Sequence, residues 1–221
     1  MTSAPGRRPT RRGPSTGPTV FVVDDDPAVR KSLLFLLASV GLEAQAFADG
    51  PSFLEAYDRA SPGCLILDVR MPHLSGLALQ GKLRDAGVEI PTIMMSAYGD
   101  VGVAVRSMKN GAVEFLEKPL RDQELLDSVN HALETDRVRR AELAQVAQVA
   151  RGLESLTARE REVLRSVIDG KANKQTAADL GLSQKTVEVH RARVLAKLGA
   201  ASTAELVRLV VKYEATQRPG V

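Results

Sequence analysis

The sequence has no tryptophan, few other aromatic residues and only one cysteine. Aromatic residues make up 4% of the 221 residues, so the hydrophobic core has to be built from Leu, Val, Ile and Ala. Cys64 cannot form a disulfide within the chain, and this favours a reducing, cytoplasmic location. No apolar run approaches the roughly 18 residues that span a bilayer, so we expect no membrane partner. Disulfide-rich secreted proteins and membrane-spanning proteins are therefore excluded.

The net charge of +3 hides an uneven distribution along the chain. Residues 1–18 carry four arginines and no acid, and with almost no apolar residue they are predicted to form a disordered basic tail. Residues 19–130 hold 16 acidic and 10 basic side chains, whereas residues 155–213 hold 11 basic and 6 acidic ones. An acidic front and a basic back predict two domains with different partners, the second a candidate for binding nucleic acid.

Five short apolar runs alternate with amphipathic stretches between residues 19 and 130. The runs cover residues 20–23, 42–47, 64–68, 90–95 and 112–116, and each has the length of a buried strand. The predicted core face of the first helix consists of Leu33, Leu34, Leu36, Leu37 and Val40. The candidate buried positions of the helix at 101–111 are Val103, Ala104 and Met108. Strands that alternate with helices predict an α/β doubly wound domain with a five-stranded parallel sheet.

Polar side chains stand where the apolar runs end. Asp24 and Asp25 follow the first run, Asp68 ends the third, Ser96 follows the fourth and Lys118 follows the fifth. Each of these residues alone would have an ordinary explanation as a helix cap or a loop residue. Because the carboxyl ends of parallel strands meet at one edge of a sheet, however, the whole set is expected to converge there.

The chemistry of this set points to phosphoryl transfer. Three carboxylates packed together repel one another unless a cation neutralises them, and Mg²⁺, with Mn²⁺ as an alternative, prefers such oxygen ligands. Lys118 and the hydroxyl of Ser96 would face the same space and could contact an anion. Positioning and charge neutralisation do most of the work in phosphoryl transfer, and Asp68 is the best candidate for the nucleophile.

Residues 122–154 are predicted to form one long helix or two helices. The positions that would pack on the sheet domain are Leu125, Leu126, Val129 and Leu133. Farther along, the apolar positions with a 3–4 spacing are Leu143, Val146, Ala150 and Leu153. This spacing suits a short coiled-coil seam or an amphipathic linker, and both interpretations stay open. We assign residues 131–154 as a helical linker.

The remainder of the chain is predicted to be wholly helical. Thr157 and Glu160 form a capping-box pattern, and Asn173 is expected to cap a short helix that ends before the tight turn at 181–183. Ser183 should cap a helix over residues 184–198, and Ser202 a last helix to about residue 213, with residues 214–221 as a tail. Two helices joined by a tight turn make a helix-turn-helix.

The second helix of this pair has the charge and the width to enter the major groove of DNA. The candidates for contacts with the groove or its phosphates are Lys185, Thr186, Glu188, Arg191 and Arg193. The candidates for contacts with the DNA backbone are Lys174 and Lys197. Glu188 could accept a hydrogen bond from a cytosine or repel non-specific DNA, and the sequence does not decide between these. His190 is expected to be structural or to contact a phosphate rather than a metal. The residues expected to point inward are Val187, Leu195 and Leu198.

Several of these motifs resemble known families. VVDDD at 22–26, LDVRMP at 67–72 with SG at 75–76, MSA at 95–97 and FLEKP at 115–119 resemble the receiver domain of bacterial two-component response regulators. LTAREREVL at 156–164, NK at 173–174 and TVEVHR at 186–191 resemble the LuxR-type DNA-binding domain. The combination is similar to the FixJ/NarL group of transcriptional regulators. It implies a flavodoxin-like receiver domain at 19–130, a helical linker at 131–154 and a small all-α helix-turn-helix domain at 155–213.

The resemblance also implies roles for the residues at the strand ends. Asp68 would accept a phosphoryl group from a phosphohistidine of a sensor histidine kinase. Asp25 and Asp68 would ligate Mg²⁺ together with the backbone carbonyl of Arg70, and Asp24 would assist through water. Lys118 would pair with the phosphoryl oxygens, and its bond to the following proline would be cis.

Two switch residues are implied as well, and both are variants of the commoner types. Ser96 stands where Thr is more usual and would shift to hydrogen-bond the phosphoryl group. Phe115 stands where Tyr is more usual and would turn inward behind it, although it also suits a plain core position. Because Phe115 has no hydroxyl group, a relay through this residue has to rest on packing.

The implied protein is a transcription factor switched by phosphorylation. The implied partners are the sensor histidine kinase, promoter double-stranded DNA, RNA polymerase and a second copy of the chain, which would dimerise through residues 101–130. No enzyme activity is expected beyond slow self-phosphorylation from small donors and self-dephosphorylation. Three alternatives are a receiver that acts as a non-phosphorylated dimerisation module, a phosphatase with an aspartyl nucleophile and a small-molecule sensor. The intact acidic set argues against the non-phosphorylated module, and Arg70 in place of a second acid argues against the phosphatase. The small-molecule sensor is disfavoured because no part of the chain is a candidate ligand-binding domain.

Overall fold

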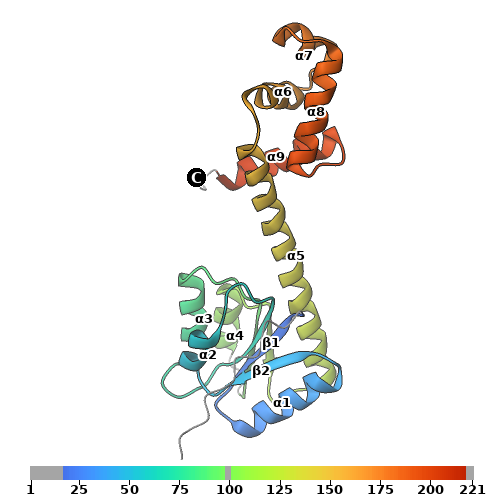
Figure 1. Cartoon of the computed structure of the whole chain (residues 1–221). Helices are drawn as coiled ribbons and strands as arrows, with labels where there is room; N and C mark the ends of the chain where they lie inside the picture. Colours follow the sequence, from blue (N-terminus) through green and yellow to red (C-terminus); the bar gives the residue numbers. More distant parts are fainter. Residues whose placement is uncertain (1–16, 98–100, 218–221) are drawn as a thin grey trace, which may run out of the picture. The chain divides into compact units, whose positions relative to one another are not determined.

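The computed structural model describes residues 17–97 and 101–217, and the chain divides into two compact units between Val138 and Arg139 (Figure 1). The predicted basic tail lies almost wholly outside these residues, as does the end of the predicted C-terminal tail. Within the two described ranges, no helix has both the length and the apolar composition needed to cross a membrane.

The N-terminal unit contains a five-stranded, wholly parallel sheet. Its strands are β1 (Thr19–Val23), β2 (Glu43–Phe47), β3 (Gly63–Asp68), β4 (Thr92–Ser96) and β5 (Glu114–Glu117). They lie in the order β2-β1-β3-β4-β5, and every neighbouring pair is parallel. This order is that of the flavodoxin-like doubly wound fold, so the predicted fold class is confirmed.

Four helices connect successive strands, a fifth follows the last strand, and together they cover both faces of the sheet. They are α1 (Pro27–Ser39), α2 (Gly50–Ala56), α3 (Gly76–Asp85), α4 (Val101–Lys109) and α5 (Asp122–Glu154). Asp26 caps α1 by accepting a hydrogen bond from the Ala28 amide at 2.8 Å, and Asp49 caps α2 through the Ser52 amide at 2.7 Å. Pro27 at the first position of α1 suits a helix start, because its missing N–H would have no partner there.

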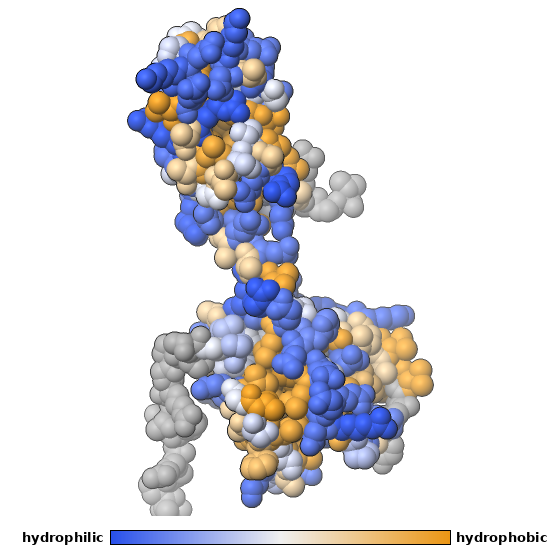
Figure 2. All heavy atoms as spheres, turned by 90° about the vertical axis from the view of Figure 1, so that its right-hand side faces the viewer, coloured by the Kyte–Doolittle hydropathy of each residue, from blue (hydrophilic) through white to orange (hydrophobic). Residues whose placement is uncertain are grey.

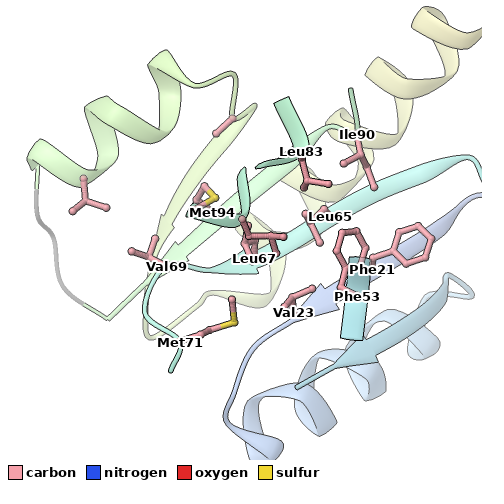
Figure 3. Packing of buried hydrophobic residues seen from close by; sticks show 13 residues of the cluster. Phe21, Val23, Phe53, Leu65, Leu67, Val69, Met71, Leu83, Ile90 and Met94 are labelled. Carbon is pink, nitrogen blue, oxygen red and sulfur yellow. The ribbon is translucent and has the colours of Figure 1, made fainter. Parts of the chain in front are cut away.

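Side chains alternate between the two faces along each strand and form two hydrophobic clusters. On β3, Leu65 and Leu67 face the cluster under α2, α3 and α4, whereas Cys64 and Ile66 face the cluster under α1 and α5. Figure 3 shows the first cluster, in which Phe53 of α2 packs beside strand residues. Because both faces are covered, the central strands are apolar on both sides and bury every side chain.

Two of the predicted core positions are wrong. Val40 is 50% exposed and Met108 is 46% exposed. Val40 is the residue that ends α1, so it does not share the inward face of that helix. In α4 the fully buried side chain is Ser107, which lies four residues after Val103 and therefore on the same side of the helix.

Helix α5 is one continuous helix of 33 residues. Leu125 and Val129 pack into the sheet unit as predicted, with Leu126 and Leu133 partly buried beside them. Beyond the border between the units, Leu143 is 55% exposed, whereas Val149 is 1% exposed and belongs to the core of the C-terminal unit. The end of the predicted linker therefore contributes to the core of the second unit.

The C-terminal unit adds four helices, which are α6 (Ala158–Ile168), α7 (Asn173–Leu180), α8 (Gln184–Leu198) and α9 (Thr203–Gln217). The capping box of Thr157 and Glu160 is present, and Ser183 caps α8 through the Thr186 amide at 3.1 Å. The turn between α7 and α8 completes the predicted helix-turn-helix. Helix α9 continues to Gln217, four residues beyond its predicted end.

The predicted cap of α7 is wrong. The residue at the cap position is Ala172, which makes no side-chain hydrogen bond, and Asn173 is the first residue of the helix. The Asn173 Oδ1 atom instead accepts a hydrogen bond from Arg191 at 2.9 Å. Leu195 is partly buried and packs against the core as predicted, beside Val194, which α8 buries completely.

Candidate functional site

Two buried carboxylates and one ammonium group meet at the carboxyl edge of the sheet. The Lys118 Nζ atom donates to Asp68 Oδ1 at 2.6 Å and to Asp24 Oδ2 at 2.7 Å. Asp24 is 1% exposed and Asp68 is 5% exposed, whereas 21% of the Lys118 side chain is accessible. Three residues that are 94 and 50 positions apart in the chain thus form one charged cluster, which has more negative than positive charge.

Backbone groups hold each carboxylate in place. Asp24 follows β1 directly, and its Oδ1 atom accepts a hydrogen bond from the Asp26 amide at 2.8 Å. Asp68 is the last residue of β3, and its Oδ2 atom accepts from the Arg70 amide at 2.8 Å. Each carboxylate therefore uses one oxygen for its own turn and offers the other to Lys118.

Lys118 is positioned by the end of the neighbouring strand. Its backbone amide donates to the Ser96 carbonyl oxygen at 2.7 Å, which extends the pairing of β4 and β5 by one bond. The peptide bond between Lys118 and Pro119 is cis, as the resemblance implies. The side chain reaches across the edge of the sheet to Asp68, which ends β3, and to Asp24, which follows β1.

The close packing of these charged groups shifts the pKa values of Asp68 and Lys118. Burial raises the pKa of the Asp68 carboxyl above its usual value; the hydrogen bond and charge of Lys118 work against this, and the negative charge of Asp24 adds to it. For Lys118, burial acts to lower the pKa, but the hydrogen bonds and charges of Asp24 and Asp68 outweigh it and raise the pKa. Lys118 is therefore a cation at neutral pH, and the Asp68 carboxylate is destabilised by its surroundings.

The other predicted residues of the receiver site lie close by in the fold. Ser96 ends β4 beside the Asp68 strand and is 2% exposed. Phe115 on β5 is partly buried and packs against the cluster under α2, α3 and α4. Asp25 is exposed, so it borders the buried pair rather than joining it.

The donor set fits a hard divalent cation that keeps part of its water shell. Among residues 17–97 and 101–217, no three His, Cys, Asp or Glu side chains converge into a ready metal cage. Mg²⁺ does not need one, because it is usually bound by one or two carboxylates and completes its shell with water. Asp68 and Asp24 supply two carboxylates whose charge Lys118 balances only in part, so an added cation suits this site.

Two supporting residues have no role in the sequence-based prediction. A side chain on Gly76 would drive its Cβ into the Asp68 carbonyl oxygen, so only glycine allows α3 to start this close to β3. The pattern SG at 75–76 is the only sequence signal for this approach. Arg30 on α1 donates from Nη1 to the Asp24 carbonyl oxygen at 2.7 Å, and its spacing gives no recognisable signal.

In the C-terminal unit, α8 has one exposed and one buried side. The predicted DNA-contacting residues Lys185, Glu188 and Arg193 are exposed, and Thr186 is partly exposed. Lys174, at the start of α7, is exposed as well. These side chains are accessible to a nucleic acid, and their contact with DNA stays a prediction.

The other three predicted DNA-contacting residues are engaged or enclosed within the unit. Lys197 donates to Glu160 Oε2 at 2.7 Å and to the Ser155 carbonyl oxygen at 2.9 Å. Its hydrogen bond lowers the pKa of Glu160 to about 2, with help from the Thr157 amide. Arg191 is hydrogen-bonded to its own unit, and the buried Nδ1 atom of His190 has no hydrogen-bond partner in the described part of the chain. Lys197 and Arg191 are therefore weaker candidates for DNA contacts than Lys185.

Comparison with known families identifies the class of both units. Residues 20–130 match the response regulator receiver domain, and residues 154–210 match the luxR family of bacterial regulatory proteins. The chain belongs to the response regulators that join a receiver domain to a LuxR-type DNA-binding domain, as the motifs indicated.

Individual relatives share this arrangement over nearly the full chain. Response regulator protein TodT of Pseudomonas putida is 40% identical over 214 residues, which cover 95% of this chain and 94% of TodT. The low-resolution structure of the response regulator StyR has a TM-score of 0.76 and 45% identity, covering 89% of this chain and 99% of StyR. Full-length FixJ from B. japonicum has a TM-score of 0.56 and 39% identity, covering 91% and 99% of the two chains.

Proposed function

We propose that Asp68 accepts a phosphoryl group from a sensor histidine kinase and that this converts the chain into a DNA-binding dimer that controls transcription. The observation that carries the proposal is the convergence of Asp24, Asp68 and Lys118 at the carboxyl edge of the sheet. A buried carboxylate beside an ammonium group and a hydroxyl suits phosphoryl transfer, in which positioning and charge neutralisation do most of the work.

In the proposed transfer, an Asp68 carboxylate oxygen bonds to phosphorus while the bond between phosphorus and the kinase histidine nitrogen breaks. Asp68 already points one oxygen at Lys118, whose ammonium group would stabilise the charge that develops on the phosphoryl oxygens. Mg²⁺, held by Asp68, Asp25 and the Arg70 carbonyl with Asp24 assisting, would supply charge neutralisation. Mn²⁺ would serve the same purpose.

The acyl phosphate would act as a switch through new hydrogen bonds. Moving a two-state equilibrium from 1:99 to 99:1 takes about 5.5 kcal/mol. Hydrogen bonds to charged groups contribute about 1.5–3 kcal/mol each, so bonds from Ser96 and Lys118 together with the cation reach this size. If Ser96 moves toward the phosphoryl group, Phe115 can fill the space that it leaves, because Phe115 is only partly buried.

The kinase would approach beside Lys118. A groove of about 670 Å³ lies between α1 and the segment that begins at Lys118, and it is lined by apolar side chains such as Val29 and Leu36. Phe35 at its rim is 79% exposed. Figure 2 shows hydrophobic patches among hydrophilic side chains on the visible surface of the N-terminal unit. A kinase helix with an apolar face would cover this groove and bring its phosphohistidine near Asp68.

The output would be DNA binding through α8. Its exposed side carries Lys185, Glu188 and Arg193, which suit base edges and phosphates in a major groove. Dimers formed through residues 101–130 would place two such helices on one operator. We keep residues 19–130, 131–154 and 155–213 as the proposed receiver, linker and DNA-binding domains. Contacts with RNA polymerase, the cytoplasmic location and slow self-phosphorylation and self-dephosphorylation remain predictions.

The test is to treat the full chain with a small phosphodonor and Mg²⁺ and to measure its mass and its oligomeric state. We expect one added phosphoryl group and dimers for the wild type and for Asp85→Asn, a control at an exposed carboxylate of α3. Asp68→Asn should gain neither. Phosphorylation of Asp68→Asn would contradict the proposed acceptor. A wild type that is never phosphorylated but still binds DNA would leave the front unit as a plain interaction module.

A further inference from the structure

Arg191 lies on the buried side of α8, although its charge suggests a DNA contact. Val187, Val194 and Leu198 form the inward stripe of this helix and are 0%, 0% and 1% exposed. Arg191 follows Val187 by four residues and precedes Val194 by three, which places it on the same stripe. Lys185 lies on the other, exposed side. The Arg191 side chain therefore starts toward the interior of the unit.

The guanidinium group of Arg191 links α8 to two other parts of the unit, the start of α7 and the start of α9. Its Nη1 atom donates to Asn173 Oδ1 at 2.9 Å and to the Lys171 carbonyl oxygen at 3.4 Å. Its Nη2 atom donates to Thr203 Oγ1 at 3.3 Å. Lys171 lies in the turn before α7, Asn173 is the first residue of α7, and Thr203 is the first residue of α9.

The start of α7 depends on this contact more than an ordinary helix start would. Its cap residue, Ala172, makes no side-chain hydrogen bond, and the Asn173 side chain is directed to Arg191. A planar guanidinium group offers several N–H donors in fixed directions, so one arginine can serve acceptors on α7 and α9 together. A lysine has one nitrogen on a flexible stem and cannot span both in the same way.

We propose that Arg191 is a positioning residue for DNA recognition, which holds α8 against the starts of α7 and α9 and does not itself contact DNA. The inference rests on the proposed function, because it concerns how α8 is presented to the groove. In a helix-turn-helix the recognition helix lies in the major groove while the first helix crosses the DNA backbone, so the fit depends on how the two helices are held together. Loosening their connection lowers the affinity without removing a phosphate contact.

The salt dependence of DNA binding separates these two roles. Each phosphate contact contributes about 0.9 to the slope of log K against log salt concentration. The full chain, treated with phosphodonor and Mg²⁺, would be titrated at several salt concentrations with a short duplex enriched from a random pool by the wild type. We expect Arg191→Met to bind about tenfold more weakly, the loss of one charge-assisted hydrogen bond, with an unchanged slope. Lys185→Met, on the exposed side, should reduce the slope by about 0.9.

A double-mutant cycle with Asn173→Ala tests whether Arg191 acts through its neighbour. If it does, Arg191→Met should cost much less in the Asn173→Ala background than in the wild type. Thermal unfolding would reveal whether Arg191→Met fails to fold. Arg191→Lys keeps the positive charge and is the second variant for that case. A positioning role predicts that Arg191→Lys still binds several-fold more weakly than the wild type, with the wild-type slope.

The inference is overturned if Arg191→Met lowers the slope as Lys185→Met does and Arg191→Lys binds like the wild type, because Arg191 is then a phosphate contact. It is also overturned if Arg191→Met and Arg191→Lys both bind like the wild type. In either case the wild type still binds DNA, so the proposed function stands. If the treated wild type binds no duplex, the proposed function fails and the inference fails with it.

Discussion

Replacing Lys118 with Met should destabilise the N-terminal unit, and a second change at Asp68 should largely reverse the loss. Lys118 is the cation that both buried carboxylates contact, at 2.6 and 2.7 Å. Breaking a fully buried ion pair by removing one partner costs about 3–5 kcal/mol. Because 21% of the Lys118 side chain is accessible to water, the cost should be lower, about 1–3 kcal/mol.

The direction in which Asp68→Asn changes the stability follows from the pKa of the Asp68 carboxyl. Burial raises the pKa of the Asp68 carboxyl in the folded chain, so folding disfavours its charged form and Asp68→Asn should stabilise the unit at neutral pH. Without Lys118, the ammonium group that offsets this burial is gone. Asp68→Asn should therefore stabilise the Lys118→Met variant more than it stabilises the wild type.

The assay is urea unfolding of a chain that ends at Val138, followed by far-ultraviolet circular dichroism in the presence of a chelator. The chelator matters because a divalent cation would replace part of the missing charge. All four members of the cycle would be measured at pH 7. Equal effects of Asp68→Asn in both backgrounds would show that Lys118 and Asp68 are not coupled, and the electrostatic explanation of this site would then be wrong.

Gly76→Ala should destabilise the N-terminal unit by about 3 kcal/mol in urea unfolding, because the new Cβ would meet the Asp68 carbonyl oxygen. The control Gly81→Ala, whose Cβ would enter open space, should lose no stability. Val149→Ala should destabilise the C-terminal unit by about 2 kcal/mol in the same assay. If its stability is unchanged, α5 does not contribute to the core of that unit. The folded pKa of Glu160 is about 2, below the value of 4.5 expected when unfolded, so its contribution is present above pH 4.5 and lost toward pH 2. In thermal unfolding, Glu160→Gln should therefore lose less stability than the wild type as the pH falls from 4.5 to 2. A variant with the same pH profile of stability as the wild type would contradict this.

The strand ends were predictable from the sequence because two independent signals agree there. Four of the five apolar runs stop at a polar residue, and the alternation of strands with helices implies one parallel sheet with a common carboxyl edge. Asp24, Asp68, Ser96 and Lys118 could thus be assigned to one region. The contact of Lys118 with both carboxylates could not, because a hydropathy pattern does not place a side chain relative to residues that lie 94 and 50 positions away in the chain.

Buried polar residues account for much of what the pattern missed. A hydropathy pattern ranks Met108 above Ser107, yet Ser107 is fully buried and Met108 is 46% exposed. Asp136 on α5 is 2% exposed, and its Oδ2 atom accepts a hydrogen bond from the Gly63 amide at 2.9 Å. It continues the inward spacing of Val129 and Ala132, so spacing could have found it where polarity did not.

The same conflict between polarity and burial explains why the proposed phosphoryl site can act as a switch. Asp24 and Asp68 are buried at the ends of strands whose other side chains are mostly apolar, and one partly exposed ammonium group is their shared cation. Residues that disfavour the folded state at one place are tolerated when function needs them and the remaining core supplies the stability. A phosphoryl group on Asp68 would offer new acceptors to Lys118 and Ser96, so the hydrogen bonds around Asp24 would have to rearrange. If the cycle at Lys118 and Asp68 shows strong coupling, this destabilised arrangement is the starting state from which phosphorylation shifts the receiver.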